Sequence, residues 1–190
     1  VNDGSARIPE RSVVTFPKRG KYSEDILEML GVKYYMHKKS DGRFPWAYPL
    51  WEYPQYRLVW EDDNFQILEN TKSFPRAFLA SSYKVETEDQ KILDALYSVD
   101  RRDAIVLEKE PAILPEPGEG EVAIETYRPT EVILNTEADG NKLLFMSDVY
   151  DGGWRASIDG NPAELYRANF DFRALAVPSG LNERSSPPLV

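Results

Sequence analysis

The segment 147–155 (SDVYDGGWR) gathers the residue types in this chain that are best suited to chemistry. Asp148, Asp151 and the later Asp159 supply carboxylates, and Trp154 supplies a ring on which a sugar could stack. Glycoside hydrolysis needs two carboxylates that face each other across a sugar. Aspartates beside glycine also form turns, because their side chains hydrogen-bond the nearby backbone. An acidic catalytic pair and a set of turn residues are therefore both open interpretations.

The ring of Trp154 has two interpretations of its own, as a core side chain and as a surface that faces a ligand. The preceding Gly152-Gly153 is too short for a phosphate loop and lacks the lysine and the strand-to-helix context of one. It predicts a sharp bend that delivers the ring to a sheet. A calcium site would use nearby carboxylates, although the ligand spacing of an EF-hand is absent. The candidate ligand-binding residues in this part of the chain are Asp148, Tyr150, Trp154 and Asp159.

A second group of rings lies in residues 38–54, which also contain three prolines. Trp46 and Trp51 are the candidate ligand-binding residues of this segment. The rings could fold back as a satellite core beneath a long loop. They could also form an exposed aromatic surface for sugar or lipid, because long ordered loops are often functional.

Several kinds of chemistry have no residues to support them. The chain has no cysteine, which excludes disulfides, thiolate metal sites and a cysteine nucleophile. His37 is the only histidine, whereas multi-histidine metal sites need more of them. We therefore expect no metal site and no cofactor in this chain, whereas the acidic pair stays open.

Composition sets the class of molecule. The chain has 190 residues, of which 42% are hydrophobic and 12% aromatic, so it can build one large or two small cores. A net charge of −9 argues against a nucleic-acid partner, which needs a basic surface. No stretch approaches the ~18 apolar residues of a membrane span. Because the chain begins at Val1 and shows no signal-peptide pattern, we expect a fragment or mature part of a longer protein.

The first part of the chain alternates helix and strand patterns. A helix is predicted at residues 22–30 with Ser23 as its N-cap, and a second where Thr87 and Gln90 form a capping box. Together with the predicted strands, these helices indicate an α+β part over residues 1–112. The strands are expected at residues 12–16, 32–36, 56–60, 65–68, 76–85 and 104–107.

Prolines mark a linker at about residues 110–120, and beyond it the pattern contains strands only. The tripeptide Asp-Gly-Asn occurs at 139–141 and again at 159–161, and Asp-Gly favours tight hairpins. Short strands at roughly ten-residue spacing predict an all-β antiparallel sandwich over residues 113–190, of jelly-roll or immunoglobulin-like type. These strands are expected at residues 122–127, 131–136, 142–147, 154–158, 164–168 and 172–177.

Several motifs in order resemble one known family. They are LGVKY (30–34), ENTKSFPRAF (69–78), LLFMSDVYDGGWRASIDG (143–160), RAN (167–169), FR (172–173) and VPSG (177–180). This series resembles the C-terminal extracytoplasmic segment of bacterial YfhO-type multi-pass membrane proteins, which are of glycosyltransferase-C type. The resemblance covers most of residues 26–180.

The resemblance implies a non-catalytic domain at the extracytoplasmic face of the bacterial cytoplasmic membrane, attached to the transmembrane region of its parent. The parent would modify cell-envelope glycans or polymers, and its catalytic carboxylate would lie in an early loop outside this chain. Partners would be an acceptor glycan or a lipid-linked sugar. Two alternatives stay open: a free-standing carbohydrate-binding module that uses Trp154 and the rings of residues 44–53, and an acidic-pair glycoside hydrolase.

The end of the chain departs from the family pattern. Where the family continues with an alternating strand after Gly180, residues 181–190 do not alternate and contain two prolines. We therefore expect the last strand to be missing or replaced. An open sheet edge would result, and such an edge invites pairing with a second copy of the chain.

Overall fold

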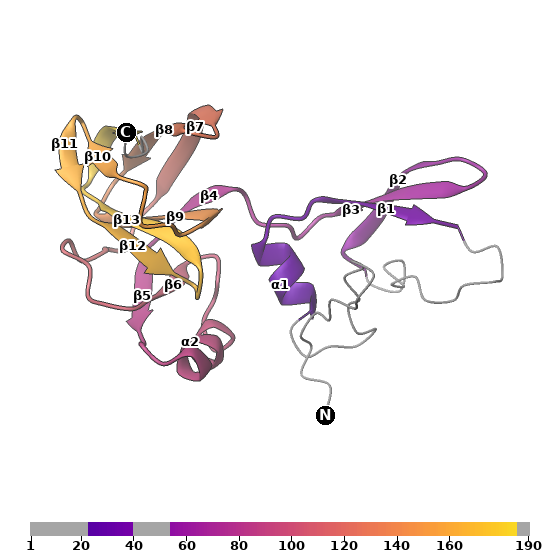
Figure 1. The fold of residues 1–190 in the computed structure, drawn as a ribbon, viewed down its shortest axis with the longest axis horizontal. Coiled ribbons are helices and arrows are strands. Elements are labelled where there is room, and N and C mark those ends of the chain that lie inside the picture. Colours follow the sequence, from indigo (N-terminus) through magenta and orange to yellow (C-terminus); the bar gives the residue numbers. More distant parts are fainter. Residues whose placement is uncertain (1–22, 40–53, 186–190) are drawn as a thin grey trace. The chain divides into compact units, whose positions relative to one another are not determined.

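The computed structural model describes residues 23–39 and 54–185 (Figure 1). The chain divides into two compact units, Val1–Pro75 and Arg76–Val190. In the described residues strands predominate over helices, and most strand pairs are antiparallel. The expectation of antiparallel β-structure is therefore confirmed at this level.

The first unit contains a small antiparallel sheet with the strand order β1-β3-β2. Its central hairpin turns where the Asp62 carboxylate accepts hydrogen bonds from the backbone N–H groups of Asn64 and Phe65, both at 2.7 Å. The strands expected at residues 56–60 and 65–68 are confirmed and form this hairpin. The described elements are α1 (Ser23–Met29), β1 (Tyr34–Lys38), β2 (Tyr56–Glu61) and β3 (Phe65–Asn70). The strand expected at residues 12–16 lies outside the described residues.

The second unit contains two sheets. A curled six-stranded sheet has the order β4-β9-β13-β12-β6-β5, and only its β5–β6 pair is parallel. Its strands are β4 (Ala77–Ala80), β5 (Ser82–Val85), β6 (Ala104–Leu107), β9 (Lys142–Val149), β12 (Leu165–Ala168) and β13 (Phe172–Val177). A five-stranded antiparallel sheet has the order β11-β10-β14-β8-β7. Its strands are β7 (Gly120–Arg128), β8 (Glu131–Ala138), β10 (Ala156–Ile158), β11 (Asn161–Ala163) and β14 (Gly180–Ser185).

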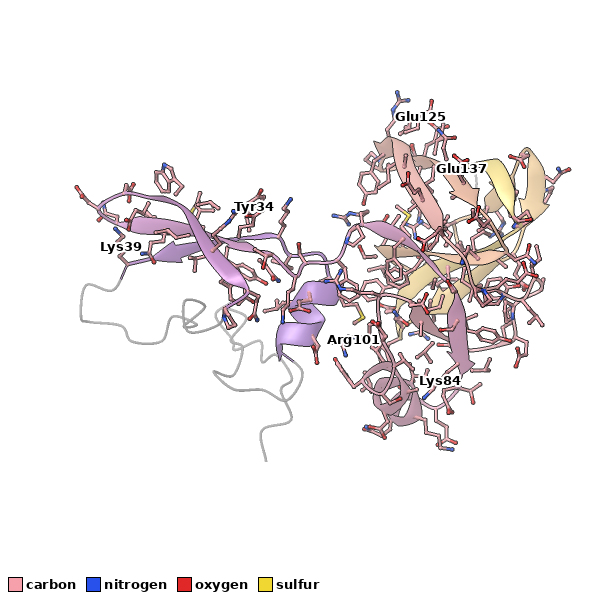
Figure 2. All side chains as sticks on the ribbon, turned by 180° about the vertical axis from the view of Figure 1, so that it is seen from behind. Tyr34, Lys39, Lys84, Arg101, Glu125 and Glu137 are labelled. Atoms are coloured by element: carbon pink, nitrogen blue, oxygen red, sulfur yellow. The ribbon has the colours of Figure 1, made fainter. Side chains whose placement is uncertain are left out.

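One core joins these two sheets. Val132 and Leu134 of β8 cluster with Leu144 and Met146 of β9 and with Leu175 of β13. Burial alternates along β8, as expected for a strand with one covered face, whereas β13 is buried throughout. The outward-facing side chains of β7 and β8 include the labelled Glu125 and Glu137, both exposed (Figure 2). Apolar faces of both sheets are thus removed from water together.

The helix α2 (Asp89–Leu96) forms close to its predicted place but begins differently. Its N-cap is Glu88, whose side chain makes no capping hydrogen bond, so the predicted capping box of Thr87 and Gln90 is wrong. Gln90 instead donates to the Asp94 carboxylate at 3.2 Å. The apolar face, which buries Ile92 and Leu96, holds the helix in place.

The strand predicted at residues 76–85 is two strands. The backbone N–H groups of Ser81 and Ser82 both donate to the carbonyl of Asp103, at 3.0 and 3.1 Å, and the chain changes partner there. β4 pairs with β9, whereas β5 pairs with β6. Strands from before residue 112 therefore belong to the same sheet as strands from after it. The domain boundary expected between residues 112 and 113 falls inside the second unit.

The proline-rich segment 110–120 is fastened to this unit. The N–H of Ala112 donates to the Tyr166 hydroxyl at 2.8 Å, and the N–H of Glu116 donates to the Asn141 carbonyl at 2.8 Å. The ammonium of Lys142, which is fully buried, donates to the carbonyls of Glu116 and Gly118 at 2.8 and 2.6 Å. These bonds explain why a composition typical of linkers does not separate two domains here.

The two Asp-Gly-Asn tripeptides behave differently. Asp159 and Gly160 have φ of 50° and 79°, and they close the β10–β11 hairpin as the sequence predicts. The tripeptide at 139–141 instead links β8 to β9, which lie in different sheets. The prediction of a hairpin at that position is therefore wrong.

The expected loss of the last strand is also wrong. β14 pairs with β8 from Gly180↔Ala138 to Ser185↔Ile133 and contacts β10 on its other side. It lies in the middle of its sheet. Its side chains do not alternate between apolar and polar, but the hydrogen bonds between strands come from the backbone and do not require that alternation. The expected dimer depended on an open sheet edge at this position. The edge is covered here, because β14 pairs with a strand on each side. None of the helices in the described part of the chain has the length or apolar composition to cross a lipid bilayer.

Candidate functional site

The candidate site begins at a bulge in β9. Phe172 of β13 pairs with Val149, but the next residue, Arg173, pairs with Met146. Ser147 and Asp148 are therefore extra residues on β9, and the Ser147 N–H donates to the carbonyl of Arg76 at 2.9 Å. Bulges bend a strand and re-aim a side chain. Here the bulge turns Asp148 toward groups from several elements.

The carboxylate of Asp148 accepts hydrogen bonds on both oxygens. Oδ1 accepts from Nη1 of Arg76 at 3.0 Å and from the hydroxyl of Tyr127 at 2.8 Å. Oδ2 accepts from Nη2 of Arg173 at 2.6 Å. The side chains of Asp148 and Arg173 are only 13% and 6% exposed. The buried guanidinium of Arg173 and the half-exposed guanidinium of Arg76 therefore both pair with this carboxylate through charge-assisted hydrogen bonds.

Aromatic rings cover both guanidinium groups. The guanidinium of Arg173 lies 4.4 Å from the ring centroid of Trp154, and that of Arg76 lies 5.3 Å from the ring of Tyr127. Both distances are within cation–π range. Trp154 also packs against the shared core, so it combines the two interpretations that the sequence left open.

The Tyr127 hydroxyl has an unusual electrostatic environment. Burial raises the pKa of this phenol, and donation to the Asp148 carboxylate raises it further. The phenol is therefore kept in its protonated, hydrogen-bond-donating form.

A tight turn presents Trp154. The Trp154 N–H donates to the Asp151 carbonyl at 3.2 Å, and the Gly153 N–H donates to the Asp151 carboxylate at 2.7 Å. A Cβ on Gly153 would lie 2.8 Å from that carboxylate oxygen, so a larger residue here would displace the Asp151 side chain from this hydrogen bond. Asp151 is thus engaged in turn formation. No group of three acidic or histidine side chains in residues 23–39 and 54–185 could hold a metal ion.

A pocket of about 340 Å³ opens beside this cluster, and we name it the Trp154 pocket. Aromatic, aliphatic and charged side chains line it: Tyr127, Arg128, Pro129, Val132, Asp148, Val149, Trp154 and Arg173. The Nε of Arg173 has no hydrogen-bond partner among the described residues, although the side chain is buried. Buried polar atoms usually have hydrogen-bond partners, so this N–H is an exception among the residues that line the pocket.

A second pocket of about 470 Å³, which we name the Tyr150 pocket, is more polar. Its lining consists of Glu108, Lys109, Tyr150, Leu165, Arg167 and Asp171. Arg167 pairs with Glu108 at 3.1 Å and with Asp171 at 3.5 Å. Lys109 pairs with Glu164, whose pKa is lowered mainly by that hydrogen bond.

The candidate ligand-binding residues predicted from the sequence do not all lie in one pocket. Asp148 and Trp154 line the same pocket, and Tyr150 lines the other. Asp159 lies in the β10–β11 turn and lines neither pocket, so it does not join Asp148 as a facing carboxylate there. Trp46 and Trp51 lie outside the described residues.

Sequence reasoning missed Arg76, Tyr127 and Arg173. Arg173 left a detectable sign, since it is the one charged residue in the buried strand β13 (FRALAV). A buried charge must find a partner, and that partner had to come from another element. Arg76 and Tyr127 carry no such sign, because both are exposed and nothing in the sequence around them predicts a contact with Asp148.

No protein-family model, curated protein or solved structure matches the chain.

Proposed function

We propose that this chain is a non-catalytic glycan-binding domain and that the glycan binds in the Trp154 pocket. The observation that carries the proposal is the meeting of two aromatic rings, Tyr127 and Trp154, with the Asp148–Arg173 ion pair around an open pocket of about 340 Å³. Small-molecule sites are mostly apolar and aromatic, with a few polar groups that fix orientation. A sugar offers a C–H face to the rings and hydroxyl groups to the ion pair.

Binding fits the pocket better than hydrolysis does. Hydrolysis of a glycosidic bond uses two carboxylates on opposite sides of the sugar. Asp148 is the only carboxylate among the described residues that line the Trp154 pocket, and its oxygens already accept three hydrogen bonds. An acidic-pair glycoside hydrolase therefore has no support from this pocket.

The proposed parent is a YfhO-type, glycosyltransferase-C-like membrane protein, with this domain at the extracytoplasmic face of the bacterial cytoplasmic membrane. The order of the sequence motifs supports that parent, and a role in cell-envelope glycan modification follows from it. We also propose that the second unit is a β-sandwich of jelly-roll or immunoglobulin-like type. Its support is the single core that residues of the five- and six-stranded sheets share.

The reading frame of the parent separates this proposal from a free-standing carbohydrate-binding module. Ten or more hydrophobic spans upstream of Val1 are expected. A signal peptide directly upstream, with no spans, would instead support the free-standing module.

Glycan binding itself is tested on an array with the wild-type chain, Trp154→Ala and a matched control, Tyr83→Phe. Tyr83 lines neither pocket, and its hydroxyl bonds to Glu110. The wild type and the control should bind the same glycan, and Trp154→Ala should bind it at least about tenfold more weakly, or ~1.4 kcal/mol. Absence of wild-type binding, or equal binding by folded Trp154→Ala, contradicts the proposal.

A further inference from the structure

Residues that line the Trp154 pocket and residues that line the Tyr150 pocket follow one another at the end of β9 and at the start of β13. Val149 of β9 pairs with Phe172 of β13. Their neighbours on one side, Asp148 and Arg173, are joined by a 2.6 Å ion pair and line the Trp154 pocket. The same two strands therefore build one wall of that pocket.

The neighbours on the other side of this pair line the second pocket. The N–H of Tyr150 donates to the carbonyl of Asp171 at 2.8 Å, and both residues line the Tyr150 pocket. Two residues of chain span at most about 7 Å. The Cα atoms of Asp148 and Tyr150, which line different pockets, therefore lie no farther apart than about 7 Å.

The charges of the Tyr150 pocket suit a neutral ligand with many hydroxyl groups. Arg167 is shared between Glu108 and Asp171, and Lys109 is paired with Glu164. A fully charged ligand would compete with these partners. Hydroxyl groups can donate to the carboxylates and accept from the cations, and both kinds of bond are compatible with the existing pairs.

The turn beside the Tyr150 pocket is held in an unfavourable conformation. Asn169 and Phe170 have φ of 47° and 81°, and a positive φ is rare for a bulky residue. The side-chain oxygen of Asn169 accepts a hydrogen bond from the Val106 N–H at 2.8 Å. The backbone N–H of Asn169 donates to the Val106 carbonyl at 2.8 Å. Such conformations persist where surrounding bonds fix them, and they concentrate at binding sites.

We propose that the two pockets are neighbouring subsites of one groove, and that the ligand is a linear glycan long enough to occupy both. This inference rests on the proposed function, since it assumes that the Trp154 pocket binds sugar. It adds a requirement for chain length, and it assigns Tyr150 and Arg167 to the second subsite.

Isothermal titration of the full chain with chito-, cello- and malto-oligosaccharides of one to six residues tests the inference. In the series that binds, affinity should rise at least tenfold between the shortest ligand that binds and a chain that spans both pockets, and then level off. Tyr150→Ala should remove this gain while it leaves affinity for the shortest ligand within twofold. Arg167→Gln is a second variant with the same expected effect, and Tyr83→Phe is the control.

The outcomes separate the two proposals. Affinity that does not depend on chain length, or a gain that persists in both variants, overturns the two-subsite groove and leaves glycan binding standing. If the wild type binds none of the three series, the groove falls together with the proposed function. Retained affinity for the shortest ligand shows that each variant is folded.

Discussion

Asp148 joins parts of the chain that are far apart in sequence. Its three partners, Tyr127, Arg173 and Arg76, lie 21, 25 and 72 residues away. A carboxylate with this little exposure is stable only while its partners stay in place. The same residue therefore shapes the Trp154 pocket and contributes to the stability of the second unit.

Removing one partner of the buried pair should be costly. Asp148→Ala leaves Arg173 buried without its carboxylate, so we expect the free energy of unfolding to fall by about 3 kcal/mol. Urea denaturation measures the change. The double variant Asp148→Ala/Arg173→Met should recover at least half of the loss, because no unpaired charge is left buried.

A surface pair provides the control for that experiment. Lys91 pairs with Glu88, and these side chains are 59% and 68% exposed, so Lys91→Met should cost less than about 1 kcal/mol. A cost for Asp148→Ala as small as that of Lys91→Met would contradict a stabilising role for the buried pair.

At the scale of elements, local patterns predicted where most strands occur, but they predicted strand pairing only for a tight hairpin such as β10–β11. β13 matches its predicted range at both ends, because its apolar run stands between clear turns. β14 was missed because its position depends on the neighbours β8 and β10. The capping box failed for a related reason, since packing of the apolar face outweighs a cap worth about 1 kcal/mol.

The candidate site was predictable to a similar extent. Asp148 and Trp154 stood out because their segment is rich in turn residues and aromatic residues. The bulge that directs Asp148 toward Arg173 depends on the register between β9 and β13, which is a tertiary property. Sequence periodicity carries no information on such a register shift.

Lys142 fixes the segment 116–118 to the start of β9, and its removal should loosen that segment. Its ammonium donates to the Ser81 hydroxyl as well as to two backbone carbonyls. Lys142→Met leaves those acceptors without a donor, so we expect a loss of about 2 kcal/mol in the free energy of unfolding. Amide hydrogen exchange should become faster around residues 112–120.

Lys84→Met is the matched control, because Lys84 is an exposed lysine that bonds to Ser98. It should change neither quantity measurably. Unchanged exchange in Lys142→Met would show that the ammonium does not hold the segment.

At the scale of the whole molecule, the division of the chain into two units determines which fragments of it should fold. The second unit takes β4, β5 and β6 from residues before 112, and these strands complete its six-stranded sheet. A boundary at 112/113 would remove half of that sheet, including the strands on either side of α2. Composition suggested that boundary, and hydrogen bonding places the segment inside the unit.

Two fragments test this division. Residues 76–190 should unfold cooperatively in urea and should give the dispersed amide spectrum of a folded domain. Residues 113–190 should not, because the apolar strands that remain would have lost β4 and β6 as partners. A cooperative transition in the shorter fragment would place the boundary where the composition suggested it.

The Lys142 ammonium has a consequence for how this cysteine-free chain limits its unfolded states. Its bond to Glu116 closes a loop of 26 residues, and its bond to Ser81 closes one of 61. Disulfides that close loops of such lengths stabilise small exported domains by restricting the entropy of the denatured ensemble. The hydrogen bonds of the ammonium form only in the native state. They therefore stabilise that state and leave the denatured chain unrestricted. Unlike a disulfide, this cross-link does not respond to reductants or to the redox state of the compartment.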